Sequence, residues 1–208
     1  MGRDDELQKL DENLHKVDRL LICAVSGMGG IGKTELVLQY ALRYQAKYPG
    51  GLCWLNKGDI SSQIISYCRN TLGLKVPENS DITTQLNFCW REWQPGNVLF
   101  IVDDVADYGA IKDYLPPAQP RFKILITSRQ YLGSNIKTIS LDILKENAAL
   151  DLLRSLTTDK RINEQIETAK KLVKWHWSQV KELGNLSRGK KNHVKLPSKE
   201  ELSNCNCP

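Results

Sequence analysis

The sequence predicts an α/β fold: a five-stranded, mainly parallel sheet flanked by helices, with a helical C-terminal extension. Five short apolar segments rich in Val, Ile and Leu have the length and composition of buried strands. Between them lie longer segments whose apolar residues recur every three or four positions, as on one face of a helix. Because consecutive parallel strands need a long crossover, this alternation favours a parallel sheet with helices on its faces.

Each expected element has its own local signal. Asp81 is a good N-cap for the helix that follows it, and Gly73 and Pro95 end the helices before them. The strands are expected at residues 20–25, 52–55, 98–102, 123–129 and 137–141. The helices are expected at residues 2–17, 35–48, 61–72, 81–93, 145–156 and 163–181, the last interrupted by the bulky residues 175–177.

The stretch between the first strand and the next helix is the most informative. Gly27–Thr34 matches G-x-x-x-x-G-K-[ST], the loop that wraps the phosphates of a nucleotide. Its glycines let the backbone aim N–H groups at an anion at the positive end of a helix. Lys33 would reach the β- and γ-phosphates and the Thr34 hydroxyl would bind Mg²⁺. The alternative is a Gly-rich surface turn before an ordinary helix, which the flanking strand and helix disfavour.

Charged side chains end two further strands at the edge where ligands bind in open α/β sheets. Asp103 and Asp104 follow the apolar run 98–102, so Asp103 would hold Mg²⁺ through its water shell and Asp104 would orient or deprotonate the attacking water. Two solvated aspartates after a strand are the alternative, and the phosphate loop upstream favours the functional interpretation. Arg129 would contact the γ-phosphate; an ordinary surface arginine fits its spacing equally well.

Composition limits the class of protein. The 208 residues suffice for one domain and an extension, with 41% apolar and 25% charged residues, as in a soluble globular protein. No apolar segment is long enough to span a membrane and the acidic start is no signal peptide, so we expect a cytoplasmic protein. The net charge of +5 is concentrated after Gly184, which argues against a dedicated nucleic-acid surface. The six cysteines lack the spacing of a zinc site or a disulfide framework.

In their order along the chain, these segments resemble NB-ARC domains, signalling P-loop ATPases of the STAND class. The resemblance covers roughly residues 2–174 and is carried by Gly2–Leu7, Gly27–Thr34, Leu52–Trp54, Val98–Val105, Ile124–Arg129 and Leu141–Leu144. It implies a nucleotide switch that holds ADP in an inactive state, exchanges it for ATP, self-associates and is reset by slow hydrolysis. It also implies that the Arg129 strand lies between the phosphate-loop strand and the Asp103 strand.

The resemblance assigns residues to the site. Arg3 would lie near the adenine, Thr34 and Asp103 would serve Mg²⁺, and Asp104 would be catalytic. The nucleotide-binding residues are expected to be Gly27, Met28, Gly29, Gly30, Ile31, Gly32, Lys33, Thr34, Glu35, Arg129 and Arg3.

The C-terminal part departs from the family. Residues 169–175 are similar to the approach to a Gly-Leu-Pro-Leu motif, but that motif does not follow. We therefore expect a nucleotide-binding domain at 1–157, an incomplete helical subdomain at 158–183 and a disordered tail at 184–208, in a chain truncated, for instance, by a frameshift. The function expected is an ADP- and ATP-binding switch in signal transduction with at most slow Mg²⁺-dependent hydrolysis. The alternatives are a nucleotide-binding fragment without turnover and an AAA-type P-loop ATPase.

Overall fold

A computed structural model describes residues 2–24, 30–133, 136–156 and 166–174. Five strands form one sheet in the order β2–β3–β4–β1–β5, and every neighbouring pair is parallel. Strand β4 therefore lies between β1 and β3, as the resemblance implied. The strands are β1 (Arg19–Ala24), β2 (Leu52–Leu55), β3 (Val98–Val102), β4 (Phe122–Ser128) and β5 (Lys137–Leu141).

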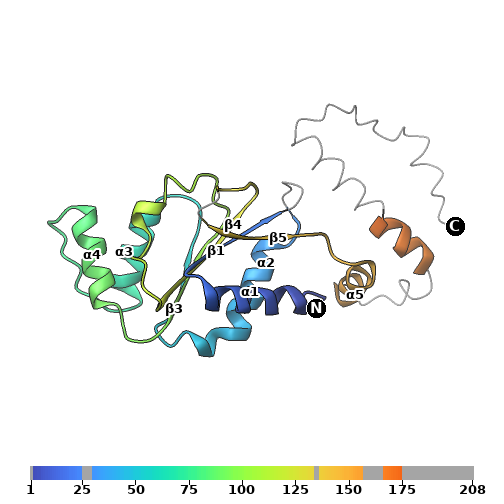
Figure 1. Ribbon diagram of the computed structural model, residues 1–208, viewed down its shortest axis with the longest axis horizontal. Helices are drawn as coiled ribbons and strands as arrows, with labels where there is room; N and C mark the ends of the chain where they lie inside the picture. Colours follow the sequence, from blue (N-terminus) through green and yellow to red (C-terminus); the bar gives the residue numbers. More distant parts are fainter. Residues whose placement is uncertain (1, 25–29, 134–135, 157–165, 175–208) are drawn as a thin grey trace.

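Helices cover both faces of this sheet (Figure 1). The α-helices are α1 (Asp4–Lys16), α2 (Lys33–Tyr44), α3 (Ile60–Asn70), α4 (Ile82–Glu92) and α5 (Glu146–Leu156), with short 3₁₀ turns at Gln45–Lys47 and Lys112–Tyr114. Residues 166–174 are also helical. The predicted α/β class is confirmed.

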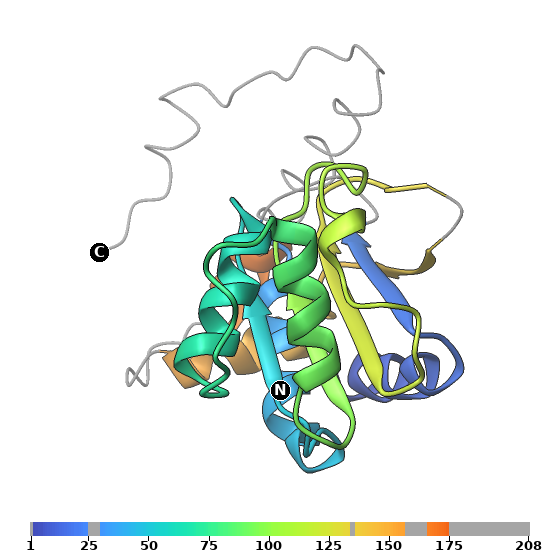
Figure 2. The same ribbon diagram turned by 90° about the vertical axis from the view of Figure 1, so that its left-hand side faces the viewer.

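Strand β3 is buried throughout and divides the core in two. Val98, Phe100 and Val102 pack with α3 and α4, which lie side by side in Figure 2. Leu99 and Ile101 pack on the opposite face with residues of α1 and α2. The alternation arises because successive side chains of a strand point to opposite faces. A strand covered on both sides is apolar at every position, and this explains the unbroken run in the sequence.

Several element boundaries differ from the sequence-based expectation, and those of the second and third helices have identifiable structural reasons. The second helix begins at Lys33 rather than Glu35, because Gly32 takes the N-cap position with φ of 91°. Its α-helical part ends at Tyr44, and the predicted remainder to Tyr48 is a 3₁₀ turn. Lys33 and Thr34 thus lie in the first helical turn, where backbone N–H groups have no partner within the helix.

The third helix begins at Ile60 and not at Ser61, because Asp59 caps it. The Asp59 carboxylate accepts hydrogen bonds from the Ser62 backbone N–H at 3.1 Å and from the hydroxyls of Ser61 and Ser62 at 2.6 Å each. These bonds to the ionised form, the Ser61 hydroxyl first, lower the pKa of Asp59 to about 2.

Replacing Asp59 by alanine is expected to lower the free energy of unfolding by about 1 kcal/mol, the usual value of an N-cap. Because the pKa is lower in the folded chain than in the unfolded one, the cap stabilises fully above about pH 4, and its contribution is lost as the pH falls towards 2. Urea unfolding of both proteins at pH 7 and pH 3 measures this. A difference between them that grows on acidification would contradict the assignment.

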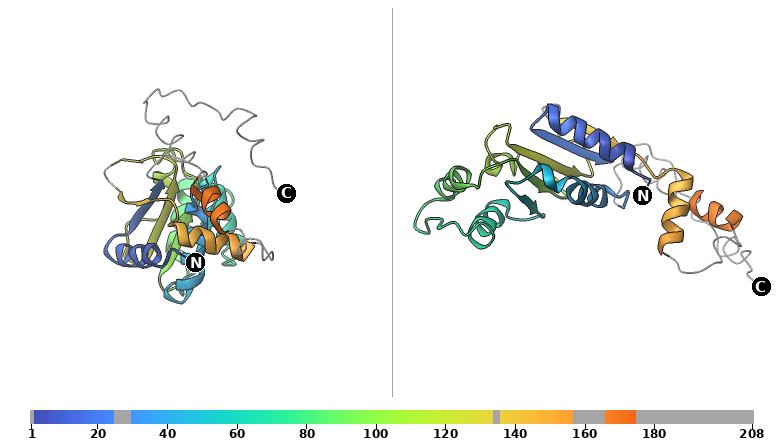
Figure 3. Two further views of the ribbon diagram at one scale, coloured as in Figure 1. Left: turned by 90° about the vertical axis from the view of Figure 1, so that its right-hand side faces the viewer. Right: turned by 90° about the horizontal axis from the view of Figure 1, so that it is seen from below.

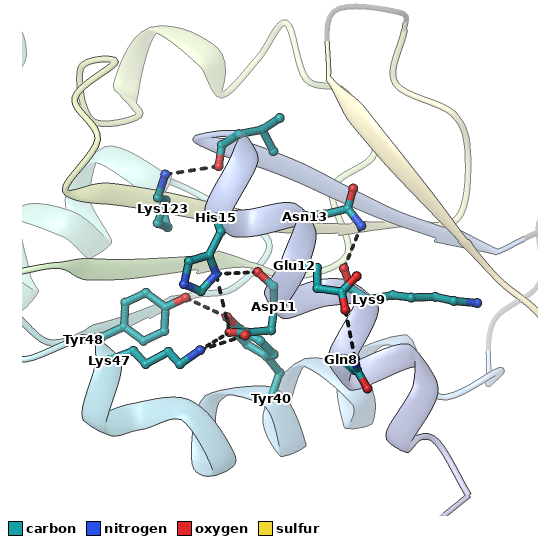
Figure 4. Close-up of polar contacts among 11 residues, drawn as sticks. Gln8, Lys9, Asp11, Glu12, Asn13, His15, Tyr40, Lys47, Tyr48 and Lys123 are labelled. Atoms are coloured by element: carbon teal, nitrogen blue, oxygen red, sulfur yellow. Dashed lines mark hydrogen bonds and ion pairs between the residues drawn. The ribbon is translucent and has the colours of Figure 1, made fainter.

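Helix α1 is held against α2 by a polar cluster (Figure 4). The Lys47 ammonium donates to both oxygens of the Asp11 carboxylate, at 2.8 and 2.7 Å, and the Tyr40 hydroxyl donates to one of them at 3.2 Å. The hydroxyls of Tyr40 and Tyr48 are 2.8 Å apart, and burial raises the pKa of Tyr40. The contacts orient α1, whose N-cap position is Arg3, relative to the helix that begins at Lys33.

The C-terminal helices lie at the end of the molecule opposite α3 and α4 (Figures 1 and 3). Ala149 and Leu150 of α5 pack with Ala169 and Val173 of the helical segment 166–174. The expected domain boundary at 157/158, the residues 175–177 and the tail at 184–208 lie outside the described residues, as do Gly27, Met28 and Gly29. None of the described helices is both long and apolar enough to cross a membrane.

Candidate functional site

The described end of the glycine-rich loop joins β1 to α2 at the C-terminal edge of the sheet. Gly30 and Gly32 have φ of 78° and 91°, values that residues with a side chain adopt rarely. Within the described part of the chain, an added Cβ at either position would meet no atom closer than 4 Å, so conformation rather than space requires glycine. The Leu36 N–H donates to the Gly32 carbonyl at 2.9 Å, the first bond of the helix. A left-handed glycine before a helix N-terminus is suited to an anion.

Lys33 is buried, with 8% of its surface exposed. Lysine is rarely buried unless its ammonium interacts with a group of opposite charge or a polar cluster. Its place in the first turn of α2 puts this cation next to the glycine loop. The arrangement fits the predicted phosphate-binding role.

The structure brings together the two residues predicted to serve Mg²⁺. The Thr34 hydroxyl lies 2.9 Å from Oδ1 and 3.0 Å from Oδ2 of Asp103, 69 residues away in sequence. Asp103 is placed there by β3, and its backbone N–H donates to the Leu55 carbonyl of β2 at 2.9 Å. A hydroxyl and a carboxylate in contact are the hard oxygen ligands that Mg²⁺ prefers, so these residues fit such an ion.

Asp104 and Arg129 also lie close together. Their side chains form an ion pair with each other, which the predicted roles toward water and the γ-phosphate did not include. Nε and Nη2 of Arg129 each donate to one oxygen of the Asp104 carboxylate at 3.0 Å. The two charged groups line a hollow of about 220 Å³ together with Lys57. The Arg129 side chain is 63% exposed and the Asp104 side chain is 39% exposed. This bidentate pair therefore contributes little stability, and each side chain can exchange its partner. Sequence reasoning did not foresee the pairing, although opposite charges at the ends of neighbouring strands were a signal for it.

A further residue of the site, Thr127, was missed. Its side chain is 1% exposed and its hydroxyl contacts both residues of the acidic pair. The available signal was a threonine near the end of a mostly apolar buried strand, three residues after Ile124. Such a group requires hydrogen-bond partners, and the sequence alone does not name them.

Arg3 and Glu35 occupy the rim of the site. The Arg3 guanidinium donates to the Ile31 carbonyl at 3.2 Å and forms an ion pair with Glu6 at 3.2 Å, so the start of α1 touches the phosphate loop. The Glu35 carboxylate accepts from Gln39 on its own helix at 2.8 Å and is exposed. Roles for both toward a nucleotide stay predictions.

The sequence is similar to that of a longer curated protein. A nucleotide-binding leucine-rich-repeat-like protein of the fungus Hyaloscypha variabilis is 26% identical over 204 residues, which cover 84% of this chain and 20% of that protein. The chain thus spans about a fifth of the length of this curated relative.

Two solved structures share the fold. A STAND protein with a tetratricopeptide-repeat sensor from Pyrococcus horikoshii has a TM-score of 0.51 at 20% identity, covering 84% of this chain and 27% of that one. Cdc6p from Pyrobaculum aerophilum has a TM-score of 0.55 at 16% identity, covering 73% of this chain and 48% of that one.

The candidate site lies in a P-loop NTPase fold. It contains the glycine loop, the buried lysine and the Thr34–Asp103 contact. The sequence model of the NB-ARC domain matches residues 3–163. This chain therefore belongs to the NB-ARC domain family.

Proposed function

We propose that the chain is an adenine-nucleotide switch domain of the STAND class that binds ADP and ATP with Mg²⁺ and acts in cytoplasmic signal transduction. The contact between Thr34 and Asp103 carries the proposal. It joins the first turn of the phosphate-loop helix to the acidic end of β3, as a phosphate-bound cation requires. The preference for adenine and a nucleotide-dependent self-association rest on the family, and the description of the Pyrococcus horikoshii protein as a signal transduction ATPase supports a signalling context.

The oxygens of Thr34 and Asp103 would hold the cation. Among the described residues no three His, Cys, Asp or Glu side chains gather into a metal site of their own. Mg²⁺ in nucleotide sites needs only one or two protein ligands, because substrate phosphates and water supply the others. When bound, it would neutralise charge on the β- and γ-phosphates. Lys33 would bind the same phosphates, and the loop N–H groups would orient them.

Slow hydrolysis is part of the proposal, with Asp104 orienting or deprotonating the attacking water and Arg129 contacting the γ-phosphate. The second candidate is nucleotide binding without turnover. The ion pair between Asp104 and Arg129 favours this second candidate, because each of these side chains already binds the other. The NB-ARC match favours either candidate over an AAA-type remodelling ATPase.

Phosphate release under single-turnover conditions, with ADP titrations on the same preparations, tests the proposal. The variant is Asp104→Asn, because Asp104 has φ of 55°, which asparagine tolerates and alanine does not. We expect wild type to bind ADP and release phosphate slowly, and Asp104→Asn to bind ADP but release phosphate about 100-fold more slowly. Asp107→Asn, the same change at an exposed position three residues on, is the control.

Each other outcome has a distinct meaning. No binding of ADP or ATP by wild type at millimolar concentration would refute the proposed function. Binding without phosphate release in any protein would establish the second candidate. Equal release by wild type and Asp104→Asn would remove Asp104 from the mechanism while leaving an ATPase.

A further inference from the structure

The hydroxyl of Thr127 connects the two neighbouring aspartates after β3. It donates to Oδ1 of Asp103 at 2.5 Å and accepts from the backbone N–H of Asp104 at 2.9 Å. Thr127 belongs to β4, which pairs with β3 up to Val102 and Ile126. The hydroxyl therefore reaches across one step beyond the last paired residues, where the chain leaves the sheet.

These two bonds define the orientation of the Thr127 hydroxyl group. A threonine hydroxyl has one hydrogen, and here it is directed to Asp103 while a lone pair faces Asp104. Because the Thr127 side chain is 1% exposed, water has little access to replace either bond. A β-branched side chain in a strand has few rotamers, so the oxygen is held in position before any ligand arrives.

The Asp103 carboxylate thus stands between two threonine hydroxyls. Thr34 approaches both carboxylate oxygens from α2, whereas Thr127 binds only Oδ1 from β4. A bond on one oxygen from a rigid buried strand fixes the rotation of the carboxylate. With that rotation fixed, both carboxylate oxygens stay within hydrogen-bond distance of the Thr34 hydroxyl.

The backbone of the following residue is held by the same strand. Asp104 has φ of 55°, an unfavourable conformation for a residue with a side chain. Its N–H is bonded to the Thr127 hydroxyl, and the next N–H, of Val105, donates to the Thr127 carbonyl at 2.9 Å. One residue therefore sets the carboxylate of Asp103 and the turn that carries Asp104.

We infer that Thr127 is the positioning residue of the magnesium site: its hydroxyl holds the Asp103 carboxylate ready for the cation that accompanies the nucleotide. The inference rests on the proposed function and deepens it. Partners that orient metal-binding carboxylates typically contribute 10- to 100-fold to metal affinity. The gain comes from pre-organisation, because Asp103 need not be reoriented when the nucleotide and its cation bind.

The test is the ratio of ADP affinity in Mg²⁺ to ADP affinity in EDTA, measured by calorimetry on the full chain. Thr127→Val keeps the branched shape and removes the hydroxyl, whereas Thr127→Ser keeps the hydroxyl. Ser128→Ala is the matched control, since Ser128 is 0% exposed and its hydroxyl donates to the Val105 carbonyl at 2.7 Å without touching Asp103. Thermal unfolding without nucleotide confirms that each variant is folded, and Thr127→Ala replaces Thr127→Val if the latter is not.

We expect Thr127→Val to lower the ratio about tenfold, chiefly through weaker binding in Mg²⁺, with affinity in EDTA nearly unchanged. Thr127→Ser should restore most of the ratio, and Ser128→Ala should leave it at the wild-type value even if its melting temperature falls. A merely structural role would move the melting temperature and not the ratio.

Three results would overturn the inference and are distinguishable. An unchanged ratio in Thr127→Val, with wild type responding to Mg²⁺, would show that the hydroxyl does not position Asp103 and would leave the proposed function intact. A ratio of one in wild type, with ADP bound, would remove the magnesium site itself. Absence of ADP binding in wild type would refute the proposed function and the inference together.

Discussion

Replacing Lys33 by alanine is expected to weaken ADP binding about 100-fold or more. Lys33 is a buried residue in the first turn of α2, beside the glycine loop. A hydrogen bond to a charged group contributes about 1.5–3 kcal/mol, and about 2.7 kcal/mol corresponds to a factor of about 100 in affinity. Removing the cation also removes its attraction for the remaining phosphate charge, so the loss extends to ATP.

Calorimetric titration of ADP into both proteins measures the change. Lys9→Ala on α1 is the control, because Lys9 is exposed and its replacement alters the net charge equally. Thermal unfolding without nucleotide shows whether Lys33→Ala retains its fold. Equal ADP affinity in wild type and a folded Lys33→Ala protein would contradict the assignment of the phosphate loop.

Replacing Phe100 by alanine is expected to lower the free energy of unfolding by about 3–5 kcal/mol, the usual cost of truncating a buried Phe. Its ring is 0% exposed, and the ring centroids of Trp93, Trp90 and Phe122 lie 4.9, 5.6 and 6.0 Å from its own. The cost combines the lost burial with a cavity that this aromatic cluster cannot readily fill. Since most domains are stable by only about 5–15 kcal/mol, the variant should be close to unfolding at 37 °C.

Urea unfolding followed by circular dichroism and tryptophan fluorescence gives the value. Phe88→Ala on α4 makes the same chemical change at a partly buried position where Arg91 lies 5.5 Å from the ring. We expect it to cost about 1 kcal/mol, since less area is withdrawn from water. Similar costs for the two variants would mean that the cluster around Phe100 is looser than its geometry indicates.

The sequence by itself predicted the local elements and the residue types that gather at the candidate site. The run 98–102 predicted a buried strand because a strand covered on both faces has no polar position. The glycines and Lys33 predicted the loop because few residues tolerate positive φ, and a helix N-terminus attracts anions. Asp103 was placed correctly at the carboxyl edge because a parallel sheet directs all its strand ends to one edge.

Boundaries were less certain where several residues could perform one task. Both Asp59 and Ser61 are suitable N-cap residues, and the structure selects Asp59 because its carboxylate reaches the Ser62 N–H. The second helix was predicted to start two residues too late. Lys33 and Thr34 belong both to the phosphate-loop motif and to the first helical turn, and the sequence does not separate the two; in the structure Gly32 takes the N-cap position. Alternative N-cap residues, and alternative first residues of a helix, differ little in local free energy.

Only the tertiary structure decided which polar groups meet. The pairing of Asp104 with Arg129 and the two bonds of Thr127 join residues 23 to 25 positions apart, and they depend on β4 lying beside β3. Periodicity identifies a strand but not its neighbour, because strand order is set by how both faces are buried at once. The sequence therefore determined which residues could bind a phosphate and its cation, whereas the packing of β3 against β4 decided how they are held.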